Sequence, residues 1–189
     1  MLKETYNSYN KRRARGFFFY HIHPEHKNLV GLCGPDIEYY LLVMNRIKVN
    51  NIDLYENNRE VMFKQLSTIK NPIPNLVLHY EDILNAPYKK NTIYDLDFCS
   101  SIIGKEEYIR KYKDHFIFTF SVRPVGTEET IKMFFNIREE EIFMQVEEDS
   151  PISHTIIHTE KGEEYLFATY KDTSPMCMIM KTNKLWLKQ

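Results

Sequence analysis

The stretch Asp95-Leu96-Asp97-Phe98 follows the short apolar run of residues 92–94 and closes the third strand-and-turn unit of this chain. The two earlier units are Val30-Gly31-Leu32-Cys33-Gly34 and Ile52-Asp53-Leu54-Tyr55-Glu56. In an open parallel sheet the strands end along one edge, so residues just past each strand meet in a shared crevice. Three such units predict a nucleotide-type ligand site at that edge.

Helical and strand patterns alternate along most of the chain, which predicts an α/β fold. A change to aromatic and β-branched residues near the end, with turn residues between two runs, predicts an antiparallel hairpin. We expect strands at residues 29–32, 51–55, 76–80, 92–94 and 116–122, helices at 36–49, 61–69, 106–113 and 127–146, and hairpin strands at 164–171 and 176–182.

The chain has 189 residues with 43% hydrophobic content, which fits one globular domain with a sizeable core. We predict a basic and aromatic arm over residues 1–27, followed by one domain over residues 28–189. A partner subunit or homodimer is an expectation for so small a domain, because it must recognise its substrate through loops, the basic N-terminal arm or a partner subunit.

The overall composition says more about where the protein is found than about its activity. A net charge of −1 gives no global field toward a polyanion. The three cysteines have no paired spacing, and no apolar run reaches the length of a membrane span, so we expect a soluble cytoplasmic protein. Abundant Asn, Lys, Ile and Tyr suggest an AT-rich genome, which we associate with a virus or mobile element and therefore with host cytoplasm.

The segment Lys11-Arg12-Arg13-Ala14-Arg15 precedes four aromatic residues, Phe17-Phe18-Phe19-Tyr20. One interpretation is an arm that contacts nucleic-acid phosphates through Arg13 and Arg15 and stacks bases on its rings. The other is a solvated turn that leads into a buried strand.

The turn Gly31-Leu32-Cys33-Gly34-Pro35 lies where a strand is expected to pass into a helix. Small residues there let backbone amides approach a ligand at a helix N-terminus. The turn is neither a P-loop nor a full dinucleotide fingerprint, because Asp36 stands where the third glycine would fall. A plain tight turn remains the alternative.

Acids follow the second and third expected strands. Glu56 lies about 20 residues beyond the glycine turn, the offset at which an acid binds ribose hydroxyls in such folds. Asp82 can accept the exocyclic amine of adenine, and Ile83 can pack on its ring. The alternatives are a solvated acid at a helix start and an ordinary loop acid.

Taken together, the glycine turn, the acids at Glu56 and Asp82, the Asp95–Phe98 stretch and the terminal hairpin resemble the Rossmann-like S-adenosylmethionine-dependent methyltransferases. The resemblance covers about residues 28–183. It implies that the glycine turn meets the methionine part of the cofactor, that the first acid holds ribose, and that the second meets adenine. The implied cofactor residues are Gly31, Leu32, Cys33, Gly34, Glu56, Asn57, Asp82, Ile83 and Asp95.

Members of that family that methylate exocyclic amines of bases carry an acid-Pro-Pro-aromatic motif, which Asp95-Leu96-Asp97-Phe98 resembles with both prolines replaced. The implied catalytic residues are Asp95, Asp97 and Phe98: a carboxylate orients the amine and the ring stacks on an extruded base. Cys99 offers an alternative as a thiolate that attacks a pyrimidine ring.

Two further features remain open. His21, His23 and His26 form a candidate metal cluster or ordinary polar positions, and we expect no metal. Arg123 follows the fifth strand and either meets a substrate phosphate or is a loop arginine. Residues 170–176 of the hairpin are expected to build the sheet.

The leading hypothesis is an S-adenosylmethionine-dependent methyltransferase that acts on a base of DNA or RNA. The second hypothesis is a catalytically degenerate methyltransferase fold that binds nucleic acid or a protein partner. The third is a small enzyme that uses a dinucleotide, since the glycine turn and Glu56 suit adenosine ribose in general.

Overall fold

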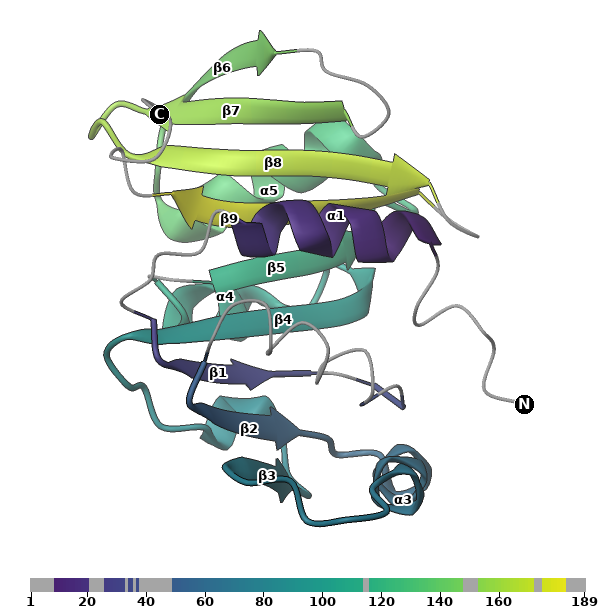
Figure 1. The fold of residues 1–189 in the computed structure, drawn as a ribbon. Coiled ribbons are helices and arrows are strands. Elements are labelled where there is room, and N and C mark those ends of the chain that lie inside the picture. Colours follow the sequence, from purple (N-terminus) through teal and green to yellow (C-terminus); the bar gives the residue numbers. More distant parts are fainter. Residues whose placement is uncertain are drawn as a thin grey trace.

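The computed structural model describes residues 9–20, 26–32, 34–35, 37, 49–113, 116–147, 153–171 and 175–182. Within these residues nine strands form one sheet, in the order β3-β2-β1-β4-β5-β9-β8-β7-β6 (Figure 1). The strands are β1 (Asn28–Gly31), β2 (Asn51–Tyr55), β3 (Leu76–His79), β4 (Thr92–Ser101), β5 (Phe116–Ser121), β6 (Ile142–Glu147), β7 (Ser153–Thr159), β8 (Glu164–Lys171) and β9 (Pro175–Thr182). The helices are α1 (Tyr9–Tyr20), α3 (Arg59–Thr68), α4 (Glu106–Lys111), α5 (Thr127–Arg138) and the 3-10 turn η2 (Ile83–Asn85).

Strands β1 to β5 are parallel, and this half of the sheet matches the predicted alternation. Strand β1 lies between β2 and β4, so the strand order reverses at this point. Such a switch point opens a crevice beyond the carboxyl ends of the strands, where ligands bind in open α/β sheets. The fold therefore positions a site between β1 and β4.

The other half of the sheet is antiparallel, and the predicted hairpin of β8 and β9 is confirmed. The prediction of one helix over residues 127–146 is wrong in its second part. Helix α5 ends at Arg138, where Glu139 adopts a left-handed conformation (φ 57°) and its N–H closes the last turn. The chain then forms β6, and β7 adds a further antiparallel strand that the sequence analysis missed.

Helices cover both faces of the sheet, with α1 on one face and α4 and α5 on the other (Figure 1). Alternate residues of β5 supply the two hydrophobic clusters. Phe116 and Phe118 pack with Phe134 of α5, whereas Ile117 joins a second cluster with Ala14 of α1. Burial on both faces explains the continuous apolar run of this strand.

The basic and aromatic segment forms helix α1, so the interpretation of a turn followed by a strand is wrong. Four side chains at helical spacing are buried on one side of it: Lys11, Ala14, Arg15 and Phe18. Two of these four residues are cations, so a pattern of apolar residues alone did not reveal the helical spacing. The helix lies against β8 and shares a core with the sheet.

Some expectations fall outside the described residues, among them most of the helix over 36–49 and the histidines at positions 21 and 23. His26 is buried before β1. No cluster of metal-ligating side chains occurs within the described ranges. None of the helices that the structure describes is long and apolar enough to cross a membrane.

Candidate functional site

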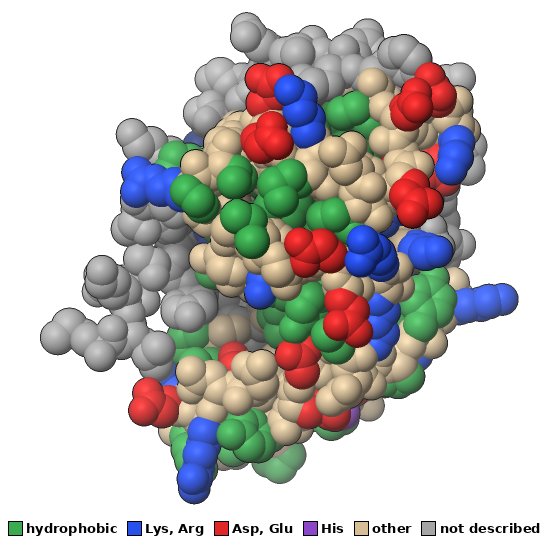
Figure 2. Space-filling model, turned by 180° about the vertical axis from the view of Figure 1, so that it is seen from behind, with side chains coloured by type: hydrophobic (Ala, Val, Ile, Leu, Met, Phe, Trp, Pro, Cys, Tyr) green, Lys and Arg blue, Asp and Glu red, His purple; other side chains and the backbone are tan. Residues whose placement is uncertain are grey.

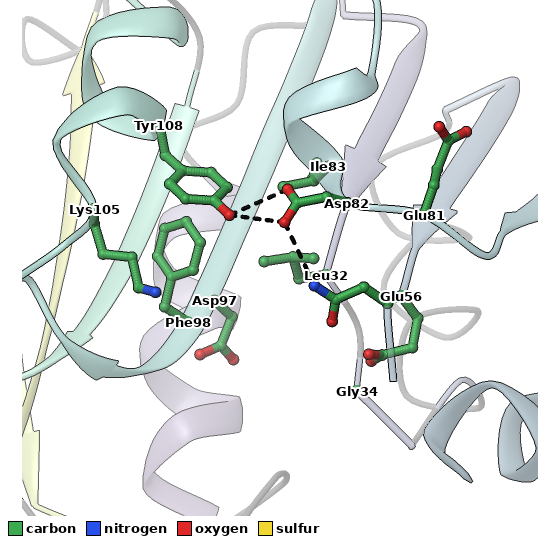
Figure 3. Close-up of a pocket in the computed structure, with 11 residues that line it drawn as sticks. Leu32, Gly34, Glu56, Glu81, Asp82, Ile83, Asp97, Phe98, Lys105 and Tyr108 are labelled. Atoms are coloured by element: carbon green, nitrogen blue, oxygen red, sulfur yellow. Dashed lines mark hydrogen bonds between the residues drawn. The ribbon is translucent and has the colours of Figure 1, made fainter. Parts of the chain in front are cut away.

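A pocket opens at the switch point between β1 and β4, lined by residues that follow β1, β2 and β3 and by residues of β4 and the start of α4 (Figure 3). Its volume of about 240 Å³ is well above the ~10–15 Å³ that holds one water, so it is more than a packing void, and it lies just below the ~300–1,000 Å³ of sites that enclose a drug-sized ligand. The lining residues are Leu32, Gly34, Glu56, Asn57, Glu81, Asp82, Ile83, Asp97, Phe98, Lys105 and Tyr108.

The structure brings most of the sequence-predicted site residues together in this pocket. They are Leu32, Gly34, Glu56, Asn57, Asp82, Ile83, Asp97 and Phe98. Gly31 is the last residue of β1, is buried, and does not line the pocket. Cys33 lies outside the described residues. Asp95, Arg13, Arg15 and Arg123 do not line the pocket.

The glycine turn is fixed by two long-range contacts. The Leu32 N–H donates to the Asp95 carbonyl (3.0 Å), which continues the β1–β4 pairing by one residue. The buried Gln65 of α3 donates its amide to the Gly34 carbonyl (2.6 Å). Gly34 has φ 60°, a conformation that favours glycine. Helix α3 therefore helps to hold the glycine turn that follows β1, through the hydrogen bond from Gln65.

Glu56 follows β2 directly, and its backbone N–H donates to the His79 carbonyl of β3 (3.0 Å). Its Oε1 accepts the Asn58 N–H (2.7 Å), while the Asn58 side chain caps α3. Burial raises the pKa of the Glu56 carboxyl, although backbone hydrogen bonds from Asn58 and Asn57 oppose the shift. A carboxylate held at a strand end in this way suits hydroxyl donors of a ligand.

Asp82 begins the η2 turn after β3 and accepts the Leu84 N–H (2.9 Å). Figure 3 shows the Tyr108 hydroxyl pointing at this carboxylate, with distances of 2.9 and 3.1 Å to its two oxygens. Burial first, and the Asp82 hydrogen bond second, raise the pKa of Tyr108 to about 12, so the phenol remains a donor. Asn57 also donates to Asp82 (3.4 Å).

Tyr108 and Lys105 are pocket residues that the sequence analysis missed. Both come from the start of α4, and no residue type in that segment marked it as part of a site. The Lys105 ammonium lies 5.1 Å from the centre of the Phe98 ring and 5.7 Å from that of Tyr108. Phe98 itself packs against Phe118 and Phe120 of β5. These contacts hold the Phe98 ring in the pocket wall; stacking on an extruded base stays a prediction.

Asp95 is not a pocket residue, which corrects its assignment to catalysis and cofactor binding. Strand β4 runs to Ser101 and does not end before Asp95, so this residue lies inside the sheet with no exposed surface. Its carboxylate faces α1, with the Arg15 Nε 3.7 Å away. Asp97 lies two residues further, on the same face, and does reach the pocket.

Asp97 is held by two cations of α1. Arg15 Nη2 lies 2.5 Å from Asp97 Oδ2, and Lys11 pairs with the same oxygen. Burial alone would raise the pKa of the Asp97 carboxyl, but Lys11 and Arg15 outweigh it and lower that pKa. Arg15 is 1% exposed, so in this structure it serves the protein interior and does not meet a phosphate.

Cys99 lies in a bulge of β4 with φ 51°, between the paired residues Asp97 and Ser101. The residue as a whole is exposed, yet its thiol donates to Asp97 Oδ1 (3.1 Å) and accepts from Lys11 (3.0 Å). Burial of the thiol and the Asp97 charge raise the pKa of Cys99 to about 12. A thiol that stays protonated is a poor nucleophile, which disfavours the carbon-methylating alternative.

The remaining candidates lie on the surface. Arg13 is exposed on α1, with its guanidinium 5.5 Å from the centre of the Tyr9 ring. Arg123 is exposed in the turn after β5. On the face drawn in Figure 2, blue and red side chains are interspersed over the coloured surface and do not gather by sign. Phosphate contacts of these arginines stay predictions.

The chain is similar to known proteins in its three-dimensional structure and not in its sequence. No protein-family model matches the chain, and no curated protein matches its sequence. An S-adenosylmethionine-dependent O-methyltransferase from Thermotoga maritima aligns over 97% of this chain and 69% of its own, with 13% identity and a TM-score of 0.56. The fold is that of the Rossmann-like methyltransferases.

Two further solved structures are similar to the chain. A tRNA methyltransferase from Aquifex aeolicus aligns over 96% of this chain and 72% of its own, with 13% identity and a TM-score of 0.55. A precorrin 8w decarboxylase from Methanobacterium thermoautotrophicum aligns over 90% of this chain and 89% of its own, with 14% identity and a TM-score of 0.54. The activities in the names of these three proteins differ, so the feature that they share is the fold.

Proposed function

We propose that this protein is a methyltransferase that uses S-adenosylmethionine as methyl donor. The observation that carries the proposal is the position of Glu56 and Asp82 at consecutive strand ends, in one pocket with the Gly34 turn. A fold found among methyltransferases supports it, and the pocket lies where ligands bind in such sheets.

The residues present fit this cofactor. Among the lining residues that the structure describes, Lys105 is the one cation, and the carboxylates are those of Glu56, Glu81, Asp82 and Asp97. An excess of acid suits a ligand whose sulfonium and amino groups are positive. Leu32 and Ile83 add apolar surface to the pocket wall. Because Gly34 has no side chain, backbone groups of the glycine turn stay open to a ligand.

The cofactor, when bound, supplies a methyl group that is already activated on sulfur, so the chain's own residues have mainly to bind and align. Glu56 accepts hydrogen bonds from hydroxyl groups of the ligand. Asp82, held by Tyr108 and Leu84, presents an ordered carboxylate to an amine. Phe98 and Tyr108 exclude water from one wall, because they pack edge to face with ring centres 4.9 Å apart.

For the acceptor we propose a nucleic-acid base, with an exocyclic amine as the methylated group. The likeness of Asp95–Phe98 to the amine-methylating motif supports the exocyclic amine. The similarity to a tRNA methyltransferase supports a nucleic-acid acceptor in general, since the product m1A in its name carries the methyl group on a ring nitrogen. Asp97 is the acid of this stretch that reaches the pocket. The substrate would be recognised through loops, exposed arginines or a partner subunit.

A second candidate function is a degenerate methyltransferase fold that binds nucleic acid or a protein without catalysis. The state of Asp97 favours it: Oδ2 accepts from Lys11 and Arg15, and Oδ1 accepts from Cys99. Unlike Asp82, Asp97 has two cations beside it, and their charge weakens the attraction of this carboxylate for the amine of a substrate.

Isothermal titration with S-adenosylmethionine and S-adenosylhomocysteine tests the proposal, with Glu56→Ala against Glu60→Ala. Glu60 is an exposed acid of α3 that does not line the pocket, so it is the matched control. We expect micromolar binding that is lost in Glu56→Ala and kept in Glu60→Ala. Binding of NAD in place of both ligands would support the dinucleotide enzyme instead, and no binding to folded protein would refute the methyltransferase.

Transfer of radiolabelled methyl groups to DNA and RNA then separates the enzyme from the degenerate fold. Label in nucleic acid would support the base-methylating enzyme. Cofactor binding without transfer to DNA, RNA, protein or small acceptors would favour the second candidate function.

A further inference from the structure

Two cations of α1 contact Asp97, a residue of the pocket wall, from the face of the sheet opposite to α4 and α5. Arg15 contacts both Asp95 and Asp97, and Lys11 contacts Asp97 and Cys99. Asp97 is the member of this group that also lines the pocket. Ion pairs thus connect helix α1 to the pocket wall.

These side chains are withdrawn from water, with exposures of 3% for Lys11, 2% for Arg15 and 4% for Asp97. Burial is the largest influence on the pKa of Lys11 and lowers it, but the charge and hydrogen bond of Asp97, together with Cys99, outweigh burial, so the pKa is raised. Because the pKa of Asp97 is lowered, all three groups carry their charges at neutral pH. Buried charges of this kind are screened little by solvent, so they act on a ligand in the neighbouring pocket.

The two cations also set the charge of the wall. Without them, Asp97 would add a full negative charge to that of Glu56, Glu81 and Asp82. With Lys11 and Arg15 in place, their positive charges offset the negative charge of Asp97. The cofactor and its product differ by one positive charge, because the sulfonium becomes a neutral thioether when the methyl group leaves.

We propose that Lys11 and Arg15 are positioning residues of the pocket: they fix Asp97 in its wall and set how strongly the site prefers the sulfonium cofactor over its thioether product. The proposal rests on the proposed function, since it assumes that the pocket binds S-adenosylmethionine. It makes α1 part of the cofactor site, although Lys11 and Arg15 do not themselves line the pocket.

The test is calorimetric titration of Lys11→Met, Asp97→Asn and a control, Arg12→Met, with both ligands. Met keeps the length of the Lys11 side chain without its charge, and Arg12 is an exposed cation on the same helix. The measured quantity is the ratio of the Kd for S-adenosylhomocysteine to that for S-adenosylmethionine. One charge added or removed near the sulfur changes this ratio about fivefold.

We expect the ratio to rise in Lys11→Met, to fall in Asp97→Asn, and to stay at the wild-type value in Arg12→Met. A ratio that is unchanged in the first two variants, even with both ligands weakened, would overturn the proposal, because loss of structure alone affects both ligands equally. Thermal unfolding shows which variants are folded. If Lys11→Met does not fold, the Asp97→Asn ratio decides by the same criterion.

The outcome for the wild type separates this proposal from the one on which it rests. Binding of both ligands by the wild type, with equal ratios in all variants, would overturn the positioning role alone. Absence of binding by the wild type would overturn the proposed function, and this inference with it.

Discussion

The two sides of the pocket are held in place by different means. On the β2 and β3 side, the carboxylates of Glu56 and Asp82 accept backbone N–H groups only two residues away, from Asn58 and Leu84. On the β4 side, Asp97 is held by Arg15, which is 82 residues away in sequence. Local turns therefore order one side, and buried ion pairs with a distant helix order the other.

The largest expected effect is on the β4 side, in Arg15→Met. This change leaves the buried carboxylate of Asp95 without its Arg15 contact and Asp97 with one cation fewer. Breaking a buried ion pair from one side costs about 3–5 kcal/mol, and we expect a loss of this size in the free energy of unfolding. Urea denaturation measures it, with Arg12→Met as the control, and a loss under about 1 kcal/mol would contradict the buried network.

Next in size is a dependence on pH that comes from the same side. The pKa of Asp97 is lower in the folded state than in the unfolded chain, so its charge stabilises the fold above the unfolded pKa of about 3.9. This contribution is lost as pH falls through the folded pKa. Wild type and Asp97→Asn should therefore differ in stability at neutral pH and converge in strong acid; a constant difference would speak against an ion-paired Asp97.

On the opposite side, Tyr108→Phe removes the phenol that donates to Asp82. We expect a loss of about 1 kcal/mol in the free energy of unfolding, because the bond joins a charged acceptor but the phenol is only partly buried. The exposed Tyr80 supplies the control as Tyr80→Phe. Equal urea midpoints for both variants would mean that Leu84 and Asn57 suffice to order Asp82.

The smallest expected effect has the opposite sign. Burial raises the pKa of Glu56, so its charged form destabilises the folded state above that pKa, and the penalty disappears as pH falls through it. Glu56→Gln should therefore be slightly more stable than wild type at pH 7 and equal to it near pH 4, while it binds the cofactor less well. A variant that is less stable than wild type at pH 7 would contradict this assignment.

The same contrast explains how much was predictable. Strand ends, the Gly34 turn and the acids Glu56 and Asp82 follow from local patterns, and the structure places them in one pocket. The contributions of Lys11, Arg15, Lys105 and Tyr108 depend on how helices pack against the sheet, which no local pattern encodes.

Two errors have local causes. Strand β4 continues through Asp95 because that carboxylate has a buried cation beside it, whereas charge alone predicted a strand end. The acids Glu139, Glu140 and Glu141 resembled the continuation of a helix, but Glu139 takes the left-handed conformation that ends α5. Strand β6 follows within three residues.

The pairing of α1 with β4 also bears on synthesis of the chain. Helix α1 leaves the ribosome early, but Asp97, the partner of Arg15, lies 82 residues later. At about 5–20 residues per second, the helix waits roughly 4–16 s for that partner. Helix α1 also lies against β8, which is made later still, so α1 cannot complete its buried contacts until β8 has left the ribosome.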